Sequence, residues 1–105
     1  MERTVQHEGP ASAGVKVQES DESRSVVLSG GLTVHTLGAV DAELAALPAK
    51  DTRIDMSSVN RLDTAGAWAI VTFQSRMAAA GHQAELDGAD AHQLDLLDTV
   101  AKAIP

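Results

Sequence analysis

The segment from residue 53 to residue 81 constrains the fold more than any other part of this 105-residue chain. A short apolar strand predicted at residues 53–57 leads into a turn at residues 59–66, and the turn opens directly into a long helix. At about 100° per residue, one narrow stripe of this helix collects five residues: Gly66, Ile70, Phe73, Met77 and Ala80. A stripe of this kind needs a sheet to cover it, so the rest of the chain has to supply further strands.

Strand and helix patterns flank this unit on both sides. Alternation at residues 15–18 and an apolar run at residues 25–29, which Gly30 and Gly31 end, predict a hairpin. A helix is predicted from about Thr36 to Leu47, and Pro48 cannot continue it.

After Gly81, the predicted stop of the long helix, residues 82–87 resume a strand pattern that Gly88 breaks. Asp90 and Gln93 then have the spacing of a capping box at the start of a last helix. We expect four residues on the buried face of that helix: Leu94, Leu97, Ala101 and Ile104.

The predicted order β-β-α-β-α-β-α indicates the α/β class, with a mixed four-stranded sheet and about three helices. The sheet begins with the N-terminal hairpin, and the later strands alternate with helices. Residues 1–14 contain Pro10 and two glycines without a period, so we predict a flexible lead-in there. The folded domain is predicted over residues 15–105.

The charge and the composition exclude several kinds of partner. With 15 acidic residues against 8 Lys and Arg, the formal net charge is −7, which argues against nucleic acid and against an anionic lipid surface. No apolar run approaches the roughly 20 residues that cross a bilayer, so direct membrane insertion is not expected. The N-terminus lacks the apolar core of a signal peptide, and we therefore expect a cytoplasmic protein.

No pattern of catalytic or metal-binding chemistry stands out. There is no cysteine, no phosphate-binding glycine loop and no serine-nucleophile turn. The histidines are scattered without metal-ligand spacing: His7, His35, His82 and His92. Asp55 and Asp63 are a candidate carboxylate pair, but no basic or nucleophilic residue accompanies them. We therefore expect no enzyme, no cofactor and no metal site.

Three features together resemble a STAS domain, the fold of anti-sigma-factor antagonists and of sulfate-transporter tails. They are the strand end at residues 26–30, the strand at residues 54–59, and Asp63-Thr64-Ala65-Gly66 at the place of the family's Asp-Ser-Ser-Gly. The resemblance runs from about residue 15 to residue 104 and implies a STAS-like fold.

The third motif departs from the antagonists, in which the second Ser of Asp-Ser-Ser-Gly is the phosphoacceptor. Ala65 stands at that position and has no hydroxyl, while Thr64, one residue earlier, is a candidate phosphoacceptor. The sequence Asp-Thr-Ala-Gly followed by Trp68 is instead similar to the STAS modules of phospholipid-transporting ABC systems of the Mla type.

That similarity implies a non-catalytic module that docks on the cytoplasmic ATPase subunit of the transporter, at the inner face of the cell membrane. The alternative is an anti-sigma-factor antagonist that binds an anti-sigma factor or kinase under phosphorylation control. Many STAS domains add a strand and a helix where this chain stops. A short domain and the front of a longer membrane permease both fit this ending, and the permease region is then a second expected partner.

The predicted partner-binding residues are Asp63, Thr64, Ala65 and Trp68. Asp63 and Thr64 also have an ordinary explanation, because both residue types stabilise the start of a helix. Trp68 lies about 160° from the centre of the buried stripe. Either a neighbouring helix of the domain or a protein partner must cover it.

Overall fold

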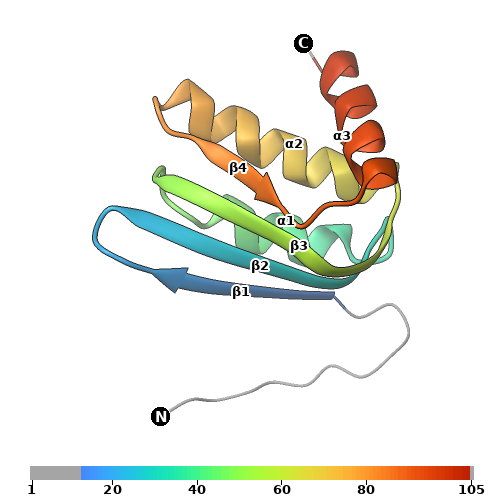
Figure 1. The fold of residues 1–105 in the computed structure, drawn as a ribbon, viewed down its shortest axis with the longest axis horizontal. Helices are drawn as coiled ribbons and strands as arrows, with labels where there is room; N and C mark the ends of the chain where they lie inside the picture. The colour runs from blue at the N-terminus through green and yellow to red at the C-terminus, as the bar shows by residue number, and fades with distance from the viewer. Residues whose placement is uncertain (1–12, 105) are drawn as a thin grey trace.

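The computed structural model describes residues 13–104, which form an α/β domain with the predicted order of elements (Figure 1). The strands are β1 (Ala13–Glu19), β2 (Ser23–Leu32), β3 (Asp51–Leu62) and β4 (Ala84–Asp87). The helices are α1 (Leu37–Ala45), α2 (Thr64–Ala79) and α3 (Ala91–Ala103). Most of the predicted lead-in at residues 1–14 lies outside the described residues, as does residue 105 of the predicted domain. Ala13 and Gly14 belong to β1 instead.

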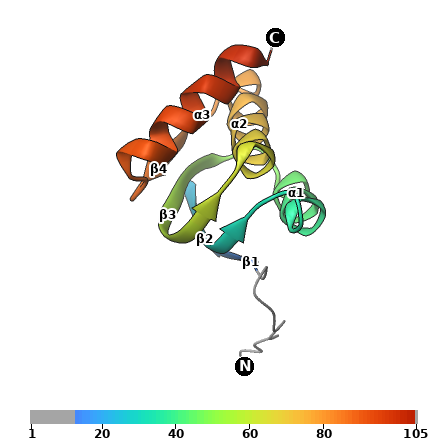
Figure 2. The same cartoon turned by 90° about the vertical axis from the view of Figure 1, so that its right-hand side faces the viewer.

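The four strands form one mixed sheet in the order β1-β2-β3-β4. β1 pairs antiparallel with β2, whereas β2–β3 and β3–β4 are parallel, because helices connect them. The register places Val17 opposite Val26 and Ile54 beside Leu86, and apolar residues from each of the four strands face the helices. Figure 2 shows α1 and α3 on either side of α2, with all three helices on this face.

The buried stripe of α2 is confirmed over most of its length. Gly66, Ile70, Phe73 and Met77 are buried, whereas Ala80 is the exposed C-cap. Ala67, Ala69 and Val71 are also buried, because α1 and α3 cover the two flanks of α2. The predicted stop at Gly81 is confirmed by its φ of 86°, which favours glycine.

Two predicted strand ends were wrong. Gly30 and Gly31 do not end β2, and residues 59–62 are not part of a turn. Instead the two strands continue side by side, with Gly30 beside Val59 and Leu32 beside Leu62. Gly30 has a φ of 78° next to a register shift, so glycine here marks an irregularity within the ladder rather than its end.

The predicted buried face of α3 was also partly wrong. Leu97 is buried as predicted, but Val100 is the second buried residue, while Ala101 is exposed and Leu94 is 46% exposed. Leu96 and Ile104 pack partly against the core. The helix packs chiefly on α2 rather than on the sheet, and this contact sets its rotation. The capping box of Asp90 and Gln93 is confirmed.

Candidate functional site

Asp63 connects the end of β3 to the first turn of α2. Its Oδ1 accepts a hydrogen bond of 3.0 Å from the backbone N–H of Gly66, which makes Asp63 the N-cap of α2. Its Oδ2 accepts another of 3.0 Å from the backbone N–H of Val34, in the loop after β2. One carboxylate therefore holds together two loops that are 29 residues apart in the chain.

The environment of Asp63 keeps its carboxylate ionised. Burial raises the pKa of the Asp63 carboxyl, but the backbone N–H groups that donate to it outweigh burial and hold the pKa below its ordinary value. His35 adds a smaller effect in the same direction. Because both carboxylate oxygens accept backbone hydrogen bonds, Asp63 positions backbone here rather than acting as an acid or base.

Thr64 is the first residue of α2 and is exposed. It does not cap the helix, because Asp63 does so, and the explanation of Thr64 as a capping residue was therefore wrong. Its hydroxyl forms no hydrogen bond to any part of the chain that the structure describes. Thr64 thus exposes its hydroxyl to solvent at the start of α2, and Ala65 beside it is partly buried.

Trp68 lies one turn after Thr64 on the face of α2 that points away from the sheet. It is 41% exposed, so the rest of the domain covers it only in part. Two further large apolar side chains are exposed among residues 13–104: Val34 at 62% and Leu94 at 46%. The sequence predicted neither, because the segment around Val34 had no clear pattern and Leu94 falls in a helical apolar period.

These three apolar side chains come from segments that meet at one end of the molecule. Figure 2 views this end, where β2 and β3 finish and α2 and α3 begin. Asp63 N donates to Leu32 O at 3.2 Å, and Gln93 Nε2 donates to Val59 O at 3.4 Å, so the segments are also linked by hydrogen bonds. We call this end of the domain, which carries Val34, Thr64, Trp68 and Leu94, the apolar end.

A hollow of about 500 Å³ adjoins the apolar end. Its walls are the end of β2, the loop after β2 and the end of β3, and they include Val34, His35, Arg61 and Asp63. In open α/β sheets, ligands bind beyond the carboxyl ends of the parallel strands, and this hollow lies at that end of β2 and β3.

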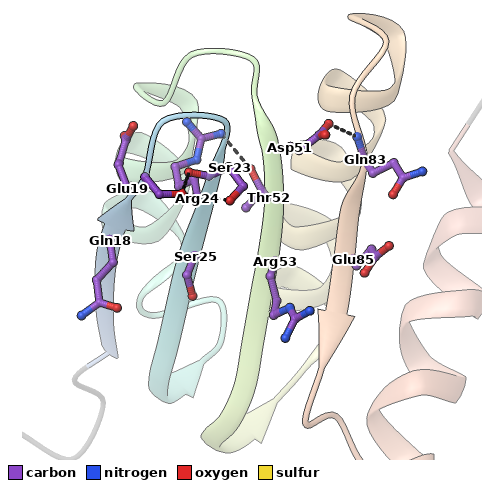
Figure 3. Close-up of a pocket in the computed structure, with 11 residues that line it drawn as sticks. Gln18, Glu19, Ser23, Arg24, Ser25, Asp51, Thr52, Arg53, Gln83 and Glu85 are labelled. Carbon is purple, nitrogen blue, oxygen red and sulfur yellow. Dashed lines mark hydrogen bonds between the residues drawn. The ribbon is translucent and has the colours of Figure 1, made fainter.

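A larger cavity of about 580 Å³ lies at the opposite ends of the strands (Figure 3). Ser23 and Asp51, the first residues of β2 and β3, line it together with polar residues of mixed charge. Asp51 accepts a 3.1 Å hydrogen bond from the backbone N–H of Gln83, and Arg53 pairs with Asp87 at 3.9 Å. Arg24 lines the same cavity, and its Nη2 donates to Thr52 Oγ1 at 2.9 Å. Its Nε and Nη1 are buried and have no hydrogen-bond partner among the described residues.

Asp55 and Asp63, the candidate carboxylate pair, do not have the separated pKa values of a catalytic acid and base. The hydroxyl and the backbone N–H of Ser57 donate to Asp55 Oδ1 at 2.7 and 2.9 Å, and both bonds lower the pKa of Asp55. The pKa of Asp63 is lowered as well, whereas a catalytic pair needs pKa values pushed apart. Residues 13–104 contain no group of three potential metal ligands. Within the same residues, none of the three helices has both the length and the apolar character of a membrane span.

Comparison with known proteins gave one family match and several solved structures. The family described as "Mlab, STAS domain" matches residues 15–101. The STAS domain of an anti-sigma-factor antagonist from Rhodobacter sphaeroides is 20% identical, with a TM-score of 0.60, over 76% of this chain and 90% of that one. No curated protein matched the chain.

Two further solved structures have the same fold. An anti-sigma-factor antagonist from Mycobacterium paratuberculosis is 22% identical, with a TM-score of 0.62, over 92% of this chain and 86% of that one. The antagonist SpoIIAA in its unphosphorylated form is 12% identical, with a TM-score of 0.65, over 81% and 82%. At identities this low, the similarities show the fold alone. They confirm the predicted STAS fold with its mixed four-stranded sheet and three helices.

Proposed function

The chain belongs to the MlaB-type STAS domain family, and from this premise we propose that it is a non-catalytic docking module of a phospholipid-transporting ABC system. In this proposal it binds the cytoplasmic ATPase subunit through the apolar end. The module works on the cytoplasmic side of the cell membrane, where a fused or associated permease holds it.

The observation that carries the proposal is the exposure of three large apolar side chains at the end of the domain where α2 begins. Val34, Trp68 and Leu94 are 62%, 41% and 46% exposed, and the segments that carry them meet at one end of the domain. A partner that buries these side chains removes apolar surface from water, which favours association. Tryptophan is enriched among the residues that contribute most to binding, and a partner that covers Trp68 removes its remaining exposure to water.

The arrangement around Asp63 makes this surface well suited to docking. The Asp63 carboxylate holds the Val34 loop against the start of α2, so Val34 and Thr64 are presented by one hydrogen-bonded unit. A surface held in place before binding loses less conformational entropy when a partner docks. The proposed contact residues are therefore Thr64, Ala65 and Trp68, with Val34 and Leu94 added, and Asp63 positions Val34 and Thr64.

The substitution Thr64→Arg tests the proposal by co-purification with the ATPase subunit encoded with this chain. The substituted side chain places a long cation at the centre of the proposed contact, and we expect co-purification to be abolished. Ser75→Arg is the matched control, because Ser75 is exposed on α2 about 16 Å further along the helix. Unchanged co-purification of a folded Thr64→Arg domain, with a wild-type circular dichroism spectrum, would contradict the docking surface.

Trp68, the one tryptophan of the chain, reports on the same contact. We expect iodide to quench its fluorescence in the isolated domain and the ATPase subunit to protect it. Quenching that is the same with and without the subunit would place Trp68 outside the contact.

A second candidate function rests on the exposed hydroxyl of Thr64. If the chain is an anti-sigma-factor antagonist, a cognate kinase transfers phosphate from ATP to Thr64, and mass spectrometry detects the added group. We expect no such product, because the family's usual acceptor position holds Ala65. Phosphate on Thr64 would favour the signalling function.

A further inference from the structure

The hollow beside Asp63 differs in charge from the rest of this acidic chain. The chain as a whole has a formal net charge of −7. The two segments that form the hollow, residues 30–38 and 59–69, contain Arg61 and Asp63 as their only formal charges, together with His35. The acidic excess of the protein therefore lies elsewhere in the chain.

Within the hollow the charge of Asp63 is already compensated by hydrogen bonds. Its oxygens accept backbone N–H groups at 3.0 Å from Gly66 and Val34. The Arg61 guanidinium has no such compensation: it is exposed and forms no ion pair with any residue between 13 and 104. By contrast, Lys50 pairs with Glu19 at 3.0 Å and Lys102 pairs with Asp98 at 3.0 Å.

The hollow has room for a side chain next to Arg61. Gly31 pairs with Arg61 across the two strands, and a Cβ at Gly31 would lie 3.8 Å from Arg61 Cβ. Because glycine has no side chain, this position leaves space beside Arg61. His35 and Asn60 line the same hollow of about 500 Å³ and provide further polar groups. Val34, which is 62% exposed, connects the hollow to the apolar end.

We infer that Arg61 binds a carboxylate side chain, Asp or Glu, of the protein that docks on the apolar end. The inference rests on the proposed function and adds the chemistry of the partner: an acidic residue next to an apolar one. The planar guanidinium fork matches a carboxylate in a bidentate pair, which fixes orientation as well as position. When a partner covers Val34, which lines the same hollow, it also removes water from around this pair, and the ionic contact becomes stronger.

The test measures the affinity of the purified domain for the ATPase subunit by isothermal titration calorimetry. For Arg61→Gln we expect Kd to rise about tenfold or more, and for Arg61→Glu to rise further, because like charges then meet. For Arg61→Lys we expect a smaller rise, since Lys cannot form the bidentate pair. Arg53→Gln is the matched control: Arg53 is exposed on the uncovered face of the sheet, and its Kd should stay at the wild-type value.

The outcomes separate this inference from the proposed function. If Thr64→Arg abolishes binding while Arg61→Gln binds like wild type, the docking surface stands and the carboxylate contact is overturned. If the wild-type domain does not bind, or neither variant weakens binding, both proposals fall. Titration of the isolated domain with acetate and with inorganic phosphate should give no saturable heat. Saturable binding that Arg61→Gln removes would assign the hollow to a small free anion and overturn the inference.

Discussion

The substitution Gly66→Ala tests how closely α2 approaches the sheet at the candidate site. A Cβ at position 66 would lie 2.7 Å from the carbonyl carbon of Leu32 and 2.8 Å from Leu32 Cβ. Carbon atoms that do not bond to one another prefer separations of about 3.5 to 4.0 Å. The carbonyl belongs to the backbone of β2 and cannot rotate away, so the start of α2 has to move off the sheet by roughly 1 Å.

The cost of this movement follows from the contacts that it breaks. Overpacking in a core costs up to about 3 kcal/mol. The shift also disrupts the hydrogen bonds Asp63 N to Leu32 O and Val34 N to Asp63 Oδ2, which contribute about 1 kcal/mol each. The better helix propensity of Ala offsets about 1 kcal/mol. We expect the free energy of unfolding to fall by about 3 to 4 kcal/mol, a large part of the roughly 5–15 kcal/mol typical of a domain.

Urea unfolding followed by circular dichroism and by Trp68 fluorescence measures this change. Gly38→Ala is the control, because Gly38 is also helical but a Cβ there would meet nothing within 4 Å. The control should unfold at a higher urea concentration, with a gain of up to about 1 kcal/mol. If Gly66→Ala is as stable as wild type, α2 does not approach Leu32 this closely, and the geometry that places Asp63 against Val34 is wrong.

Two further changes test the surroundings of the site. The pKa of Asp63 is lower in the folded chain than in the unfolded one, so its contribution to stability is complete above the unfolded pKa of about 4 and is lost as the pH falls through the folded value. Asp63→Asn should therefore lower the free energy of unfolding at neutral pH. In urea unfolding, the variant should lose less of this free energy than wild type between about pH 6 and pH 3. Parallel pH profiles of the two proteins would contradict the role of the carboxylate. On α3, Leu97→Ala should cost about 2–5 kcal/mol, because Leu97 is 4% exposed. Leu94→Ala should cost less than about 1 kcal/mol, and equal losses would show that the buried face of α3 is misplaced.

Local patterns were sufficient for much of the fold. The order of the elements, the capping box of Asp90 with Gln93 and the helix stop at Gly81 depend on residues close in sequence, and the structure confirms them. The stripe of α2 follows from helical period in the same way. The strand ends were mispredicted, because the extension of β2 and β3 comes from their pairing, and their partner residues lie far apart in the chain.

In the candidate site, too, some residues are predictable from local sequence and others only from the packing of distant segments. From the sequence, Asp63, Thr64, Ala65 and Trp68 were identified by their place at the start of a helix and by resemblance to a family motif. That these residues contact a partner protein is a proposal. Val34 was missed, because its exposure and its hydrogen bond to Asp63 exist only once β2 and β3 lie side by side.

Local sequence therefore specifies that a helix begins at Thr64 and that Ala65 lacks the hydroxyl of a phosphoacceptor. The contact between the second carboxylate oxygen of Asp63 and the Val34 loop, in contrast, depends on tertiary structure, because these residues are 29 apart in the chain. The 41% exposure of Trp68 likewise depends on how the elements pack. The physical reason is that capping and helical period act within a few residues, whereas exposure depends on which distant segments pack against a side chain.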